Sequence, residues 1–221
     1  MEQASFNHQS VLLEELVSSL NLKVGDTVVD CTAGMGGHSQ RILDIIGAKG
    51  QLVCIDQDPF ATSFLEKKFE TNVREKQVFI VQDRFSHLKK ILEQLPLQEQ
   101  PAAILADIGI SSPQLDNANR GFSFNQEGFL DMRMDPTNED TLPAYALIKE
   151  LEAQELTRIF RVYGEEEHAG LIASAIVKQR QKSDINKTTE LAELVSRTIP
   201  WRLGTSSHPA TKIFQALRIF I

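Results

Sequence analysis

The 221-residue chain has few cysteines, no long apolar run and no excess of positive charge. Its two cysteines, Cys31 and Cys54, lie in separate apolar segments, which favours a reducing compartment over a disulfide framework. A membrane-spanning segment is not expected, because no apolar stretch is long enough to cross a bilayer. The first ten residues, MEQASFNHQS, lack the basic and apolar pattern of a secretory signal and the Arg-rich pattern of a transit peptide. We therefore expect a soluble, cytoplasmic protein.

The charge balance also limits the classes of partner. There are 23 Lys and Arg residues against 30 Asp and Glu residues, which gives a net charge of −7. This argues against a protein that holds nucleic acid by bulk electrostatics, so any such contact requires a local basic patch. The sequence also contains no internal repeat and no zinc-type group of Cys and His residues, so no metal is expected.

Four short apolar runs, rich in β-branched residues, alternate with helical patterns. Near-continuous apolar runs of this length are typical of parallel strands that are buried on both faces. The chain before them, Ser10 to Leu20, has helical spacing behind a possible cap at Ser10. We therefore predict an α/β protein with a doubly wound parallel sheet. The predicted strands are Thr27–Cys31, Gln51–Asp56, Gln77–Asp83 and Ala102–Gly109.

The pattern changes after the fourth strand. Residues 110–141 are rich in Asn, Asp, Gly and Pro, which predicts a long ordered loop with little helix. Residues 142–201 have helical periodicity throughout, with Thr188 or Thr189 as a cap ahead of Glu190. A last helix is predicted to begin at Pro209, and it reaches Ile221 without a C-cap, which suggests a chain cut short.

The turn after the first strand, DCTAGMGGHS, contains Gly34, Gly36 and Gly37. Glycines there let backbone amides approach a ligand at the carboxyl edge of a parallel sheet. The spacing departs from the dinucleotide fingerprint, since Ser39 stands where the third glycine is expected. A tight connection without a ligand is an equally good interpretation of the turn alone.

Further acidic residues follow the other strands. Asp56 ends the second strand, about 20 residues beyond the glycines, where a carboxylate can accept both hydroxyls of a ribose. Asp83 and Phe85 follow the third strand and could meet an adenine, although a capping acid and a core phenylalanine are the plainer interpretation. Asp107 closes the fourth strand. With no Walker lysine, the set indicates a pocket for an adenosine-bearing ligand.

This arrangement resembles the class I S-adenosylmethionine-dependent methyltransferases, and longer motifs narrow the resemblance. GISSPQLD, RGFSF, LDMRMD, YGEEEHA and HPATKIFQALRI occur in the same order as in the bacterial 16S rRNA cytosine-N4 methyltransferases, the MraW family. The match runs from His8 to the last residue. Members of that family continue past the point where this chain ends.

The resemblance implies a Rossmann-like sheet with an all-helical domain inserted after strand four, and with the C-terminal strands absent from this chain. The implied domains are residues 1–115 for S-adenosylmethionine, residues 116–203 for substrate recognition, and residues 204–221 as a helix returning to the first domain. The implied reaction is methylation of the exocyclic N4 of a cytidine in the decoding region of 16S rRNA, in the small ribosomal subunit. The implied cofactor contacts are Gly36, Gly37, His38, Asp56, Phe85, Asp107 and Gln114.

The catalytic groups are less well defined by sequence. Related amino-methyltransferases carry a D/N/S-P-P-aromatic motif after strand four, whereas this chain has DIGISSPQ. The candidates to accept the amino proton are Ser111 and Ser112, with Asp116 less favoured, and a turn-stabilising role is as good an interpretation of each. Phe122 or Phe124 could stack on a base turned out of its helix, or could pack in the helical domain.

Candidate RNA contacts lie in the insertion, although charged runs on helices are commonly only solvated faces. They are Lys178 to Lys182, Lys187, Arg197 and Arg202, while His208 could be an RNA contact or a helix-entry residue. The alternatives for the whole chain are a methyltransferase for another amino group, a nicotinamide oxidoreductase, and a non-catalytic cofactor-binding fragment. A homodimer is also expected, since a fourth strand left at the sheet edge favours self-association.

Overall fold

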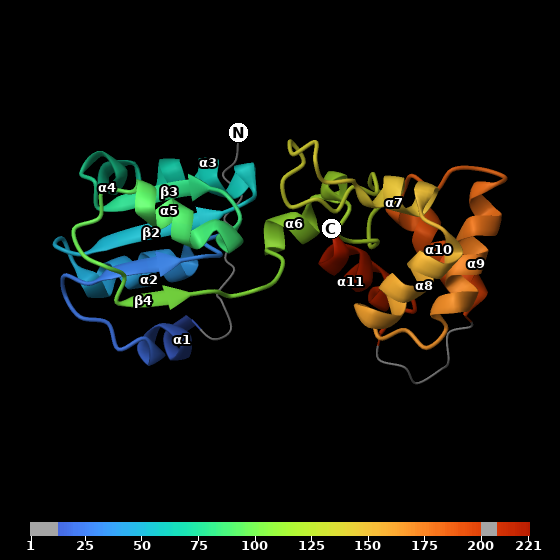
Figure 1. The fold of residues 1–221 in the computed structure, drawn as a ribbon, viewed down its shortest axis with the longest axis horizontal. Coiled ribbons are helices and arrows are strands. Elements are labelled where there is room, and N and C mark those ends of the chain that lie inside the picture. The colour runs from blue at the N-terminus through green and yellow to red at the C-terminus, as the bar shows by residue number, and fades with distance from the viewer. Residues whose placement is uncertain (1–12, 200–206) are drawn as a thin grey trace. The chain divides into compact units, whose positions relative to one another are not determined.

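A computed structural model of the protein describes residues 13–199 and 207–221. The predicted cap at Ser10 and the candidate RNA contact Arg202 lie outside the described residues. The chain divides into two compact units, residues 1–111 and residues 112–221, which are coloured blue to green and green to red in Figure 1.

Unit 1 contains a four-stranded parallel sheet with the order β3-β2-β1-β4, so β3 and β4 are its edges (Figure 1). In the register, Val29 pairs with Val53 of β2 and with Ile104 of β4. This confirms the predicted α/β class. The central strands β1 and β2 are buried almost throughout, whereas the edge strands β3 and β4 are only partly buried. The strands are β1 (Thr27–Asp30), β2 (Gln51–Asp56), β3 (Val78–Gln82) and β4 (Ala103–Leu105).

Helices cover both faces of this sheet. One core joins alternate strand residues such as Val28 and Leu52 to side chains of α1, α2 and α3, and the other joins Val29 and Val53 to α5. Alternation of side chains along each strand produces these two cores. The helices of unit 1 are α1 (Leu13–Ser19), α2 (Gly37–Ile46), α3 (Pro59–Lys68), α4 (Glu70–Arg74), the short 3-10 helix η1 (Phe85–His87) and α5 (Leu88–Gln94).

Unit 2 is helical. The helix α8 packs on α9 and on α11, and α9 also contacts α7 and α10. Gly164, at the end of α8, permits the close approach of α11, because a Cβ there would lie 2.5 Å from the carbonyl oxygen of Lys212. The helices are α6 (Ser112–Asp116), η2 (Ala118–Arg120), α7 (Ala144–Glu150), α8 (Ala153–Val162), α9 (Ala169–Arg180), α10 (Thr188–Thr198) and α11 (Thr211–Phe220).

Arginines order the long loop between η2 and α7. Arg120 donates to the carbonyl oxygens of Arg133 (3.1 Å) and Met134 (2.7 Å). Arg133 in turn forms a two-pronged ion pair with Asp131, at 2.7 and 2.9 Å, and donates to the carbonyl of Asn138. The two arginines of RGFSF and LDMRMD therefore hold the backbone of unit 2 together, which agrees with the prediction of an ordered loop.

Several predicted boundaries are wrong. The fourth strand ends at Leu105 and not at Gly109, and the last helix begins at Thr211 and not at Pro209. The cap of α10 is Lys187 and not Thr188 or Thr189, because Thr188 is buried and its hydroxyl donates to the carbonyl of Gln126. The capping carboxylate is that of Glu190, which accepts the backbone N–H of Lys187.

Candidate functional site

The glycine turn lies at the carboxyl edge of the sheet, between β1 and α2. Gly34 and Gly36 have φ angles of +51° and +71°, a left-handed region that favours glycine. Packing also leaves no room for a side chain at Gly36, since a Cβ there would lie 2.7 Å from Leu65 of α3. Gly37 is different, because a Cβ there would meet no described atom within 4 Å. The open side of the turn is therefore at Gly37.

Asp56, at the end of β2, lies directly beside this turn. One carboxylate oxygen accepts the N–H of Gly34 (2.8 Å), and the other accepts the N–H of Asp58 (2.9 Å). Burial raises the pKa of Asp56 above its ordinary value, although these two bonds oppose the shift. Asp58 has a separate task, since it caps α3 by accepting the N–H of Phe60. Of the two acids in IDQDP, the first is therefore the one beside the glycines.

A fully buried acid, which the sequence analysis did not select, holds the same turn from behind. Asp30 accepts the backbone N–H of Thr32 (3.2 Å) and the hydroxyl of Ser39 (2.7 Å). Burial raises its pKa. Ser39 also accepts the thiol of Cys54 at 3.4 Å. Ser39, which breaks the dinucleotide fingerprint, is thus the partner of Asp30. The signal that could have identified Asp30 is its position at the end of an apolar strand.

Other predicted residues of unit 1 lie at the same carboxyl edge. Phe85 begins η1 just after β3, and its side chain is 43% exposed, so it is not the core residue of the plainer interpretation. Asp83 precedes it and donates its N–H to the carbonyl of Asp56. Asp107 is exposed, and its N–H donates to the hydroxyl of Thr32 at 2.7 Å. His38 is buried in the first turn of α2.

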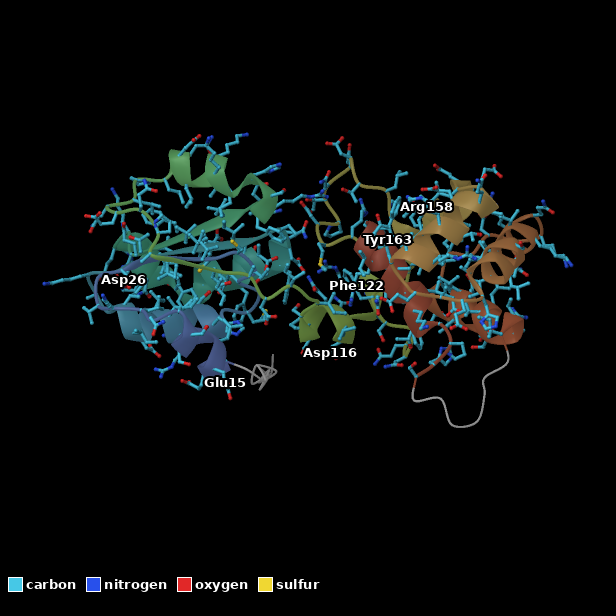
Figure 2. The ribbon with its side chains drawn as sticks, turned by 60° about the horizontal axis from the view of Figure 1, so that its bottom comes forward. Glu15, Asp26, Asp116, Phe122, Arg158 and Tyr163 are labelled. Carbon is cyan, nitrogen blue, oxygen red and sulfur yellow. The ribbon has the colours of Figure 1, made fainter. Side chains whose placement is uncertain are left out.

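The remaining candidates divide between the units. Ser111 ends unit 1, whereas Ser112 and Gln114 lie in α6 of unit 2, where Gln114 is buried. Asp116 ends α6 and is exposed; Figure 2 labels it. The structure thus brings together six of the seven predicted cofactor contacts within unit 1 and describes Gln114 in the other unit.

The aromatic candidates of RGFSF pack inside unit 2. Phe122, labelled in Figure 2, is 6% exposed and lies under the guanidinium of Arg120. Phe124 contacts the ring of Phe214 edge-on at 4.8 Å and the ring of His208 at 4.7 Å. Of the two interpretations left open, packing in the helical unit is the one the structure supports for both.

The basic candidates are partly committed to structural contacts. Arg180 donates to the carbonyls of Ile148 (2.9 Å) and Leu151 (2.7 Å) at the end of α7. Lys187 pairs with Glu127 at 2.7 Å. His208 accepts the N–H of Ala210 at the start of α11, as a helix-entry residue does. Lys178, Lys182 and Arg197 are exposed.

The turn of unit 1 fits the adenosine-bearing cofactor that the sequence implies. The space at Gly37 can take a ligand where a side chain would otherwise stand. Each oxygen of Asp56 accepts one backbone N–H and keeps a lone pair for a ribose hydroxyl. Phe85 offers an exposed ring for an adenine face. Among the described residues, no group of three or more His, Cys, Asp or Glu side chains could hold a metal ion.

Comparisons with known proteins agree with these features. The chain is 47% identical to ribosomal RNA small subunit methyltransferase H of Caldicellulosiruptor bescii, over 97% of this chain and 67% of that protein. It is 42% identical to the protein of that name from Clostridium botulinum, with the same two coverages. A solved structure, a putative rRNA-methylase from Clostridium thermocellum, aligns with 44% of this chain and 52% of its own at 21% identity and a TM-score of 0.36.

The chain spans about two thirds of the length of these curated relatives. The model of the MraW methylase family matches residues 5–221, which includes the glycine turn, the helical unit and the last helix. Neither unit alone accounts for a match of that extent. The chain belongs to the MraW methylase family.

Proposed function

We propose that the protein methylates the exocyclic N4 of a cytidine in the decoding region of 16S rRNA, within the small ribosomal subunit and in the cytoplasm. The observation that carries this proposal is the match of nearly the whole chain to proteins named ribosomal RNA small subunit methyltransferase H. The cofactor is S-adenosylmethionine, which supplies an electrophilic methyl group on a positively charged sulfur.

Unit 1 is the cofactor-binding part of this proposal. The amides of the glycine turn would face the methionine end, Asp56 would accept the ribose hydroxyls, and Phe85 would lie against the adenine. Asp107 and His38 would border the same edge. Gln114, which lies in unit 2, remains a cofactor contact that the family resemblance implies. The hydrogen bonds between Asp56 and Gly34 and between Thr32 and Asp107 support this assignment, because they fix three strand ends relative to one another.

The chemistry requires an acceptor for the cytosine amino group. The lone pair of that nitrogen is conjugated into the ring, so a hydrogen bond accepted from its N–H makes the lone pair more available. A full negative charge beside the sulfonium would favour the ground state, since the sulfur loses its charge during transfer. Ser111 and Ser112 are therefore better acceptors than Asp116. Their neutral hydroxyls and backbone carbonyls can orient the nitrogen without such a charge.

Unit 2 is the substrate-recognition part of the proposal. Its exposed cations are Lys178 on α9, Lys182 just after α9 and Arg197 on α10, and they are available for phosphate groups. A net charge of −7 means that these local charges, and not the charge of the whole protein, must attract RNA. A methyltransferase for a different amino group is the second candidate. It would use the same unit 1 and differ in what unit 2 recognises.

The experiment supplies methyl-labelled S-adenosylmethionine with small ribosomal subunits, free 16S rRNA, DNA or protein. The RNA is then digested, and the labelled nucleosides are separated. We expect N4-methylcytidine from the ribosomal substrates, little label with Asp56→Ala, and a slower transfer at unchanged cofactor affinity with Ser111→Ala/Ser112→Ala. Label in another nucleoside or only in protein would favour the second candidate. Cofactor binding without transfer to any substrate would indicate the non-catalytic alternative.

A further inference from the structure

Lys68, at the end of α3, contacts the backbone of the glycine turn. Its ammonium donates to the carbonyl oxygens of Met35 (3.0 Å) and Gly36 (2.7 Å), more than 30 positions earlier in the chain. It also lies 5.3 Å from the centre of the Phe69 ring. No predicted role for Lys68 follows from the sequence, because nothing in the spacing of α3 marks it as a partner of the turn.

The geometry of the turn explains why a cation is useful there. Gly36 adopts φ +71° and ψ +34°, and the carbonyls of two successive residues then converge on one point. Two carbonyl dipoles that point the same way repel one another, and an ammonium between them removes this repulsion. The bonds are charge-assisted, so they are stronger than those between neutral groups. The cation therefore stabilises a backbone conformation that the turn needs.

Two contacts fix the Gly36 carbonyl, and with it the N–H that the cofactor would meet. One is the ammonium of Lys68, and the other is the N–H of Gln40, which donates to the same oxygen at 3.1 Å. The peptide between Gly36 and Gly37 is trans, so its N–H points away from its C=O. With the Gly36 carbonyl directed at Lys68, the Gly37 N–H is directed to the other side. Gly37 is the first residue of α2, where N–H groups have no acceptor inside the helix. A Cβ at Gly37 would meet no described atom within 4 Å, so there is open space beside this residue.

We propose that Lys68 is a positioning residue for the amino-acid end of the cofactor. It holds the Met35 and Gly36 carbonyls on the α3 side, so that the Gly37 amide is presented to the methionine part of S-adenosylmethionine. This inference rests on the proposed function, because it takes S-adenosylmethionine as the ligand. Lys68 acts through the backbone and does not touch the ligand itself.

The test compares two ligands on matched variants by calorimetric titration of the full chain. S-Adenosylhomocysteine has the amino-acid end, and 5′-methylthioadenosine has the adenosine end without it. We expect Lys68→Met to weaken binding of S-adenosylhomocysteine about tenfold, the size of a lost charge-assisted hydrogen bond, and to leave 5′-methylthioadenosine nearly unchanged. Lys68→Arg should restore most of the affinity, because it keeps the charge and the donors.

Two controls separate positioning from folding. Lys67→Met removes the neighbouring exposed lysine of α3 and should bind both ligands like the wild type. Lys68→Gln keeps a donor without the charge, and it replaces Lys68→Met if thermal unfolding shows that the latter is not folded.

The outcomes are distinct. Wild-type affinity in folded Lys68→Met or Lys68→Gln, or an equal loss for both ligands, would overturn the inference and leave the proposed function standing. If the folded wild type binds neither ligand, the cofactor site itself is wrong, and the inference falls with it.

Discussion

At the scale of single residues, Asp56 has two tasks that respond oppositely to pH. Burial raises its pKa above 3.8, so ionising it in the folded protein costs free energy. The protonated carboxyl therefore contributes to the free energy of unfolding. This contribution is fully present below pH 3.8 and is lost as the pH rises through the raised pKa. In the proposed site, cofactor binding would require the ionised form, because a protonated carboxyl loses acceptor capacity.

We therefore predict that affinity for S-adenosylmethionine falls on acidification, beginning at a pH above 3.8. Titration calorimetry over a pH series measures this. Asp56→Asn, which is neutral throughout, should bind about tenfold more weakly, with an affinity that no longer depends on pH in this range. The same acid-induced loss in Asp56→Asn would assign the pH dependence to another group.

The residues found by sequence reasoning and those missed differ in a physical way. The positions of Asp56 and Phe85 at the sheet edge were predictable, because Asp56 ends β2 and Phe85 lies three residues after the end of β3, and the ends of parallel strands meet at one edge. Lys68 was not predictable, since its contact with the turn depends on the length and angle at which α3 returns across the sheet. Asp30 has a strand-end position like that of Asp56, but its side chain is directed into the core and not to the edge.

At the scale of helices, Arg180 contributes to the packing of unit 2. Its guanidinium donates to two carbonyls at the C-terminal end of α7, where backbone acceptors lack helical partners. We predict that Arg180→Met lowers the free energy of unfolding by about 1–3 kcal/mol, as measured by urea denaturation.

Lys178 is the matched control, two positions earlier on α9 and exposed. Lys178→Met should change the free energy of unfolding by less than about 0.5 kcal/mol. It should, however, weaken binding to 16S rRNA and reduce the dependence of that binding on salt concentration. If Arg180→Met is as stable as the wild type and loses RNA affinity, Arg180 contributes to RNA binding and not to the stability of unit 2.

Helix and strand types were readable from periodicity, whereas their ends were not. Hydrophobic spacing identified α8, α9 and α10 because each buries one face against a neighbour. The caps depend on contacts from distant segments. Thr188 was predicted as a cap, but its hydroxyl forms hydrogen bonds with the backbone of Gln126 and Gly128. The N-cap is therefore the preceding residue, Lys187.

At the scale of the whole molecule, the motifs of a family carried more information than composition. A net charge of −7 argued against bulk attraction of RNA, yet the chain matches a family of methylases along almost its full length. Composition averages over both units, whereas a motif depends on a few specific residues in a fixed order. The division near residue 111 follows the change from alternating strands and helices to helices alone.

The sheet of unit 1 has an exposed edge. β4 pairs with β1 on one side and is the last strand of the sheet in the described residues. Ile104 within β4 is 52% exposed, and Ile108 just beyond it is 77% exposed. Unpaired edges with apolar side chains favour pairing with a second chain. We therefore expect a second copy of the protein to cover this edge.

We predict that the average mass of the 221-residue protein in sedimentation experiments rises with concentration. Ile104→Lys should suppress this rise, because a lysine on an edge strand would have to lose its hydration when a second copy approaches. Val162→Lys places the same charge at a side chain of α8 that is 57% exposed, and it should self-associate like the wild type. Equal suppression by both variants would attribute the effect to net charge and not to the edge. A wild type that stays at the mass of one chain at all concentrations would show that Ile104 and Ile108 tolerate solvent without a partner.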